Sequence, residues 1–262
     1  MPELVVERIE IPSFVGNSYV VGFPGGPCAF IDAGADAAKM TEAAARHGMT
    51  PAAVLLTHHH YDHVSELEDI LDRIGRVDVL IHEFEQPLAS EFVTGFTANI
   101  EDGETIRIGD DLEFRAVATP GHTQGMLSFL GHGHVFTGDT LFRESVAGVR
   151  APGHTTFEDL RSSIMDTLLD LPDETVVVSG HAAPTTIGHE REHNPFVRVW
   201  RGLDEEGDEP VIVSLPDDDG VTQEHEVRLV LEAADYDGGT KCWIRWPDGA
   251  DDLVPGSKVR RP

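Results

Sequence analysis

The heptapeptide Thr57-His-His-His-Tyr-Asp-His63 follows directly on an apolar run. The run, residues 52–57, predicts a strand that is buried on both faces. If the chain stays extended beyond it, His58 and His60 point to the same side and His59 points away, because side chains alternate along a strand. Asp62 and His63 come next, where the chain is expected to turn into a helix.

Three further side chains that could bind a metal follow a glycine at the end of an apolar segment: His122, Asp139 and His181. Imidazole nitrogens suit zinc, iron or manganese, and a carboxylate can be shared by two ions. Four donors close one tetrahedral site, whereas seven donors with a bridging carboxylate suit two adjacent metals with an open position for water. Each of these motifs taken alone could be an ordinary turn or surface loop. The occurrence of possible metal ligands at four separate strand ends is not explained in that way.

The composition excludes several classes of protein. The 262 residues include 47 acidic and 19 basic side chains, a formal charge of −28, which disfavours nucleic acid as a partner. No run approaches the roughly 18 apolar residues that would span a membrane. The first residues do not resemble a signal peptide, so we expect a cytoplasmic protein without a membrane partner. Cys28 and Cys242 are expected to be reduced, buried thiols.

Strand and helix patterns alternate in two runs, and each run ends in a loop that carries histidine. This order predicts an α/β fold of two sheets with helices outside, a four-layer αββα sandwich. Helices are expected over residues 35–47, 83–91 and 156–171, and after His63, where Ser65 and Glu68 suggest a capping box.

The pattern changes after Arg201. We expect one unit over residues 1–201, a linker over 202–209 and a small barrel-like β module over 210–262. Trp243 and Trp246 alternate in the module and are expected in its core.

These motifs resemble those of the metallo-β-lactamase fold superfamily. The heptapeptide resembles the HxHxDH motif, and the others follow in the family's order. They are Ile-Asp32-Ala-Gly, Thr-Pro-Gly-His122-Thr-Gln-Gly, Phe-Thr-Gly-Asp139-Thr-Leu-Phe and Val-Ser-Gly-His181. The resemblance covers about residues 13–198 and implies the αββα sandwich.

The resemblance also implies a role for each residue of the cluster. Two divalent metal ions are expected, with zinc as the first choice and iron or manganese as alternatives. The first ion would be held by His58, His60 and His122, and the second by Asp62, His63 and His181. Asp139 would bridge the two ions. Asp32 would be a buried residue that supports the ligands without binding metal.

Within the superfamily the sequence is most similar to the glyoxalase II branch, which hydrolyses thioesters such as hydroxyacylglutathione. The implied reaction is attack of a metal-bridging hydroxide on a carbonyl carbon, with Asp62 and Asp139 positioning the nucleophile. Residues 144–150 and the β module depart from the branch, which puts glutathione in doubt as the thiol. Arg143, Arg150 and His154 are candidates for contact with a small-molecule substrate.

Three alternatives remain open at this point. A persulfide dioxygenase would bind a single iron through the counterparts of His58, His122 and Asp139. A lactonase would use the same metal core on a different substrate, and a non-catalytic protein would use the metal only structurally. The C-terminal module could also mediate formation of a homo-oligomer.

Overall fold

The N-terminal part of the chain forms a mixed sheet. The computed structural model describes residues 3–217 and 220–262, and the strand order of this sheet is β1-β2-β3-β4-β5-β6. Strands β3 to β6 run parallel, so their carboxyl ends share one edge, to which β4 brings the histidine-rich loop. The strands are β1 (Val5–Ile11), β2 (Gly16–Gly22), β3 (Pro27–Ile31), β4 (Thr50–Leu55), β5 (Asp78–Ile81) and β6 (Ala98–Asn99).

A second six-stranded sheet has the order β14-β13-β10-β9-β8-β7. Its strands β10 and β13 are parallel, so Asp139 and His181, which follow them, leave the sheet at the same edge. A short ribbon of β11 (Leu141–Phe142) and β12 (Ser145–Val146) follows β10. The sheet comprises β7 (Thr105–Ile108), β8 (Leu112–Ala118), β9 (Leu127–Gly131), β10 (His134–Gly138), β13 (Val176–Ser179) and β14 (Thr185–Thr186).

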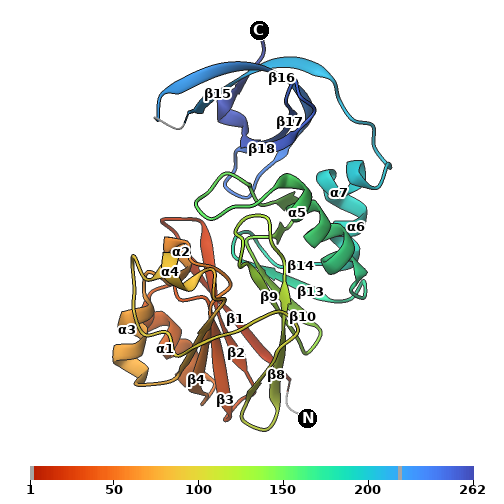
Figure 1. Cartoon of the computed structure of the whole chain (residues 1–262). Helices are drawn as coiled ribbons and strands as arrows, with labels where there is room; N and C mark the ends of the chain where they lie inside the picture. The colour runs from red at the N-terminus through yellow and green to blue at the C-terminus, as the bar shows by residue number, and fades with distance from the viewer. Residues whose placement is uncertain (1–2, 218–219) are drawn as a thin grey trace.

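The two sheets lie face to face with helices on the outside (Figure 1). In β2, Tyr19 and Val21 meet the second sheet, whereas Val20 between them faces the outer helices. The outer helices of the first sheet are α1 (Ala37–Arg46) and α3 (Leu67–Ile74), and α5 (Phe157–Ser162), α6 (Ile187–His193) and α7 (Pro195–Trp200) cover the second. The predicted four-layer αββα sandwich is confirmed.

Three of the expected helices differ from the structure. The segment around His63 forms α2 (Tyr61–Val64) and then α3. The N-cap of α3 is Glu66, whose side chain makes no capping hydrogen bond, and Ser65 is the C-cap of α2, so the expected capping box of Ser65 and Glu68 is wrong. Glu68 instead accepts hydrogen bonds from the amide and hydroxyl of Thr94.

The helix expected over residues 83–91 is reduced to α4 (Gln86–Ala89). Pro87 lies in its first turn and has no N–H to extend the helix backwards. The helix expected over residues 156–171 begins as α5 and continues as a π turn (Ser163–Thr167) and a 3-10 turn (Leu168–Asp170).

The C-terminal segment forms its own antiparallel sheet in the order β18-β17-β16-β15-β19. The strands are β15 (Glu209–Pro216), β16 (Thr222–Ala234), β17 (Thr240–Arg245), β18 (Asp251–Pro255) and β19 (Val259–Arg260), with a 3-10 turn over Gly256–Lys258. The sheet lies beside α5 and α7, at the end of the sandwich opposite the N-terminus (Figure 1). The division into residues 1–201, 202–209 and 210–262 stays a prediction.

The expected place of Trp243 in the core of the module is wrong. Cys242 and Ile244 point into that core, so Trp243 between them points to the other face of β17. Its ring packs against Phe157 of α5, with centroids 5.2 Å apart, and against Trp200 of α7. The module is therefore attached to the sandwich through buried aromatic side chains.

Two simpler expectations concern the cysteines and the membrane. Cys28 and Cys242 are free and buried, as expected. Over the described ranges 3–217 and 220–262, no helix has the length and apolar character needed to cross a membrane.

Candidate metal centre

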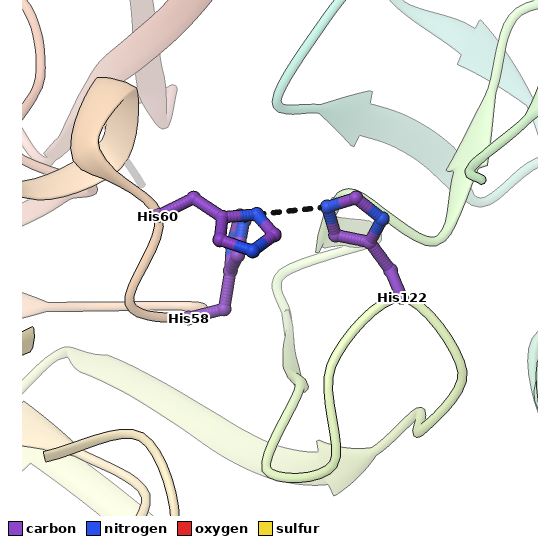
Figure 2. A group of neighbouring side chains, drawn as sticks. All are labelled: His58, His60 and His122. Carbon is purple, nitrogen blue, oxygen red and sulfur yellow. Dashed lines mark hydrogen bonds between the residues drawn. The ribbon is translucent and has the colours of Figure 1, made fainter. Parts of the chain in front are cut away.

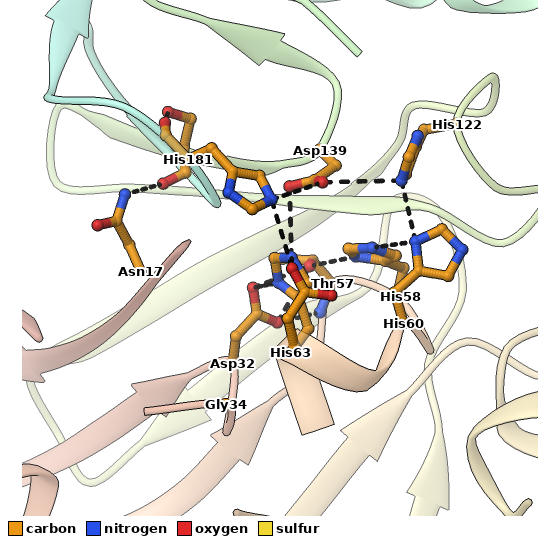
Figure 3. Close-up of polar contacts among 12 residues, drawn as sticks. Asn17, Asp32, Gly34, Thr57, His58, His60, His63, His122, Asp139 and His181 are labelled. Atoms are coloured by element: carbon orange, nitrogen blue, oxygen red, sulfur yellow. Dashed lines mark hydrogen bonds and ion pairs between the residues drawn. The ribbon is translucent and has the colours of Figure 1, made fainter. Parts of the chain in front are cut away.

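All seven of the expected ligand residues converge between the two sheets, at the edge where the parallel strands end (Figure 3). Four come from the loop after β4 and the start of α2, and three follow strands of the second sheet. Their donor atoms form three overlapping groups, each within 4.8 Å: His58, His60 and His122; His58, His63 and Asp139; and Asp62, His63 and His181.

Two imidazoles of this cluster, His60 and His122, each have one nitrogen beside a backbone carbonyl oxygen. His122 Nδ1 lies 2.7 Å from the Gly148 carbonyl oxygen and His60 Nε2 lies 2.9 Å from that of Pro152. A carbonyl oxygen only accepts, so both nitrogens carry the proton. The remaining nitrogens, His60 Nδ1 and His122 Nε2, then carry lone pairs and lie 2.9 Å apart (Figure 2).

The same reasoning applies to His58 through its neighbour Thr57. The Thr57 hydroxyl lies 3.0 Å from both carboxylate oxygens of Asp32 and must donate to them. It therefore accepts from His58 Nδ1, at 3.1 Å, which leaves the lone pair on Nε2. His58 Nε2 lies 3.0 Å from His60 Nδ1, so the lone pairs of His58, His60 and His122 are directed at the same small region.

His63 and His181 are held in the same way on the other side of the cluster. His63 Nδ1 lies 2.8 Å from Asp32 Oδ2, and His181 Nδ1 lies 3.0 Å from the Val15 carbonyl oxygen. Their Nε2 atoms both point at the carboxylate of Asp139, at 3.4 Å and 3.1 Å. The carboxylate of Asp62 lies within 3.6 Å of the same two nitrogens.

The Asp139 carboxylate lies between the two sets of imidazoles. Its Oδ1 faces His63, and its Oδ2 faces His181 and also His122, at 3.7 Å. Burial would raise the pKa of Asp139, but His181 and His63 hold it well below its ordinary range. Asp139 is therefore ionised near neutral pH and in position to be shared by two cations.

Burial also sets the charge of the imidazoles. It lowers the pKa of His58 well below its ordinary value, lowers the pKa of His122, and lowers the pKa of His60 to about 4. These rings are neutral near pH 7 and offer lone pairs. Burial acts against protonation of His63 too, but Asp139 and Asp32 raise its pKa above the ordinary value.

A divalent metal ion fits this donor set. The His63 Nε2 and Asp139 Oδ1 atoms are fully buried and have no hydrogen-bond partner, which costs free energy unless another group satisfies them. Imidazoles and carboxylates, of which the cluster has five and two, are the kinds of ligand that zinc, iron and manganese accept. The seven residues could hold one ion in each of two neighbouring positions.

Asp32 is buried behind His63, as expected for a residue that supports a ligand. Besides His63 it accepts from the Thr57 amide at 2.8 Å, and its backbone has a φ of +59°. Such a conformation is costly for a residue other than glycine. Gly34 packs so tightly here that an added Cβ would lie 1.6 Å from the Asp62 carbonyl oxygen.

Glu85 also supports the cluster, although it belongs to none of the motifs in the sequence. Its buried carboxylate accepts from the amide of His59 at 3.0 Å, from the His59 ring and from the Gly125 amide at 2.7 Å. It thereby joins the loop of His58 and His60 to the loop of His122. His59 points away from the cluster, as predicted.

The three candidate substrate residues have different positions. Arg150 lines a cavity of 250 Å³ beside His122 and Asp139, and its guanidinium donates to Asp252 at 2.7 Å. Arg143 and His154 are exposed and are not among the residues that line this cavity. Their expected contact with substrate stays a prediction.

The layered sandwich and its buried cluster of histidines and aspartates are the features by which the chain can be compared with known proteins. Residues 11–181 match the family model of the metallo-beta-lactamase superfamily. The chain therefore belongs to this superfamily.

Three relatives show what the chain is similar to. The hydroxyacylglutathione hydrolase of Salmonella typhi is 34% identical over 175 residues, which are 65% of this chain and 64% of that protein, so the chain spans less than two thirds of its length. The crystal structure of BLEG-1, a B3 metallo-beta-lactamase, is 30% identical in sequence and superimposes with a TM-score of 0.66. The match covers 74% of this chain and 99% of BLEG-1. The crystal structure of TTHA1623 in a di-iron-bound form is 30% identical in sequence and has a TM-score of 0.63. The match covers 72% of this chain and 99% of TTHA1623.

Proposed function

We propose that this protein is a thioester hydrolase that depends on two divalent metal ions, with zinc as the first choice. One observation carries the proposal. Each of the five imidazoles has one nitrogen held by an outer partner, so its other nitrogen faces the interior of the cluster, where the carboxylates of Asp62 and Asp139 also lie. The names of two relatives support it, because one is a hydroxyacylglutathione hydrolase and another binds two irons.

Divalent cations at such a site lower the pKa of water from 15.7 towards about 7 and polarise a carbonyl group. The protein's own residues orient the reaction. Asp139 is shared between the two sets of imidazoles and fixes their spacing. Asp62 is the more exposed carboxylate, with 19% of its side chain accessible, and can accept a hydrogen bond from the attacking water. A thiol leaving group, with a pKa of about 8.5, needs little help from an acid.

The first experiment is a measurement of metal content per chain on protein purified without added metal or chelator. We expect about two ions per chain, as a seven-donor site implies. His134→Gln, a change at the opposite end of β10 from Asp139, should keep both ions, whereas Asp139→Asn should lose metal.

The second experiment tests hydrolysis of S-lactoylglutathione and of N-acetylcysteamine thioesters by the metal-loaded protein. Activity that disappears in Asp139→Asn supports the proposal. A single iron per chain, with oxygen uptake in the presence of a persulfide, would replace it by the dioxygenase alternative. Two bound metals without activity on any thioester would leave a lactonase or a non-catalytic role.

A further inference from the structure

The turn between β16 and β17 packs against the cluster of candidate metal ligands. This turn, residues 235–239, is held down by Asp235, which accepts from the Ser145 hydroxyl at 2.9 Å and pairs with Lys241 at 3.1 Å. Lys241 is buried and also donates to the Val146 carbonyl of β12. A buried ammonium with two acceptors fixes the turn firmly, because separating these groups would leave a charge unpaired.

Tyr236 at the tip of this turn covers one of the candidate ligands. Its ring stacks on the His181 imidazole, with centroids 4.3 Å apart and planes 18° apart. Phe142 supports the tyrosine edge-on at 5.0 Å. The turn therefore places an aromatic side chain of the C-terminal module directly beside the atoms that would face a substrate.

The same turn closes the cavity that borders the cluster. The 250 Å³ cavity is lined by His122 and Asp139 on one side and by Tyr236 and Leu253 of the C-terminal sheet on the other. This volume is below the range of about 300–1,000 Å³ that is typical of pockets for drug-sized ligands. A substrate group must therefore be small to fit there.

The charges that line the cavity do not favour an anion. Arg150 is paired with Asp252 and Lys241 with Asp235, so both cations already have carboxylate partners. Asp237 adds a further carboxylate to the lining, and this carboxylate accepts from the Gly239 amide at 2.8 Å. A carboxylate on the substrate would be repelled by these acidic side chains, or it would have to displace Asp252 from Arg150 or Asp235 from Lys241.

We propose that the β16–β17 turn is part of the active site and that Tyr236 is a specificity-determining residue. The turn selects substrates whose group beside the scissile bond is small, uncharged and largely apolar, and it disfavours thiols that carry carboxylates, such as glutathione. This inference rests on the proposed function and narrows its substrate class. The C-terminal module thus acts as a wall of the site.

The test compares two thioester series on zinc-loaded protein, one built on the neutral thiol N-acetylcysteamine and one on glutathione. We expect a higher kcat/KM for the neutral series, with a dependence on acyl length. Tyr236→Leu should lower kcat/KM for the neutral series about fivefold and flatten the dependence on acyl length, since ring stacking is lost. Tyr236→Phe keeps the ring and should restore both.

Two further variants separate a specific effect from a general one. Asp237→Asn keeps an oxygen for the Gly239 amide but removes the charge, so glutathione should bind about threefold more tightly. His225→Leu removes an exposed aromatic ring that packs on Trp246, and it should leave the selectivity unchanged.

Binding of the two free thiols, measured by calorimetry, provides a readout that does not require turnover. If the wild type hydrolyses no thioester, the proposed function fails, and the calorimetry still tests the turn. The inference is overturned if glutathione binds or reacts better than the neutral thiol. It is also overturned if Tyr236→Leu matches the wild type in the acyl-length profile and in thiol binding.

Discussion

Gly180 tests the geometry of the metal centre most directly. It lies between Ser179 and His181, and a Cβ added to it would lie 2.3 Å from Asp139 Oδ1 and 2.6 Å from His63 Cε1. Gly180→Ala therefore places a methyl group between the shared carboxylate and one imidazole. To reach an ordinary contact of 3.4 Å, the carboxylate must move by about 1 Å.

The magnitude follows from how precisely metal ligands must be placed. Metal–ligand distances tolerate only about 0.2 Å, so a shift of this size breaks a bond to Asp139. Overpacking in a close-packed interior also costs about 1–3 kcal/mol. We expect metal affinity to fall about 10- to 100-fold, with a smaller loss of thermal stability in the metal-free protein.

A competition titration of zinc against a coloured chelator measures this loss. Gly16→Ala is the matched control, because its added Cβ would lie 3.5 Å from His181 Cε1, an ordinary contact with the same cluster. Wild-type zinc affinity in Gly180→Ala would refute the placement of Asp139 and His63 as described.

Three other substitutions test the residues around the ligands. Asp32→Ala removes the acceptor of His63 Nδ1 and should lower zinc affinity about 10- to 100-fold in the same titration, and wild-type affinity would contradict its supporting role. Glu85→Ala leaves the buried amide of His59 without its partner and should lower the free energy of unfolding in urea by about 1–3 kcal/mol, whereas an unchanged midpoint would show the contact to be dispensable. His60→Gln removes an imidazole whose folded-state pKa is lowered from 6.5 to about 4. The unfolded chain binds its proton first as the pH falls through this window, so the metal-free wild type should lose up to about 3 kcal/mol of stability that the variant keeps, as urea titrations at several pH values would show.

The ligands could be predicted from sequence because each lies within a few residues of a strand end. Parallel pairing brings the ends of β10 and β13, and so Asp139 and His181, to one edge of the second sheet. The packing of the two sheets then places this edge beside the end of β4 and His58. The resemblance to a known family then supplied the order of the motifs. β1 was not foreseen, because it is an edge strand whose charged residues, such as Glu7 and Arg8, interrupt the apolar pattern.

Glu85 and Tyr236 could not be predicted, because their roles depend on contacts between distant segments. Glu85 is 26 residues from His59 in sequence, and Asp235, which anchors the turn of Tyr236, is 90 residues from Ser145. The residues 235–239 do show a turn composition of aspartate and glycine. Composition does not specify where such a turn docks. The alternation of Trp243 likewise defines two faces of a strand without showing which one meets the sandwich.

The cluster draws its side chains from both halves of the sandwich, with four from the loop after β4 and three from the second sheet. Neither half alone could bind an ion with all of these groups. A bound ion would therefore link the two halves of the sandwich through its ligands. Its binding free energy would add to the stability of the docked state and would be absent when the halves separate. The rate at which a chelator strips the protein would then report how often the two sheets part.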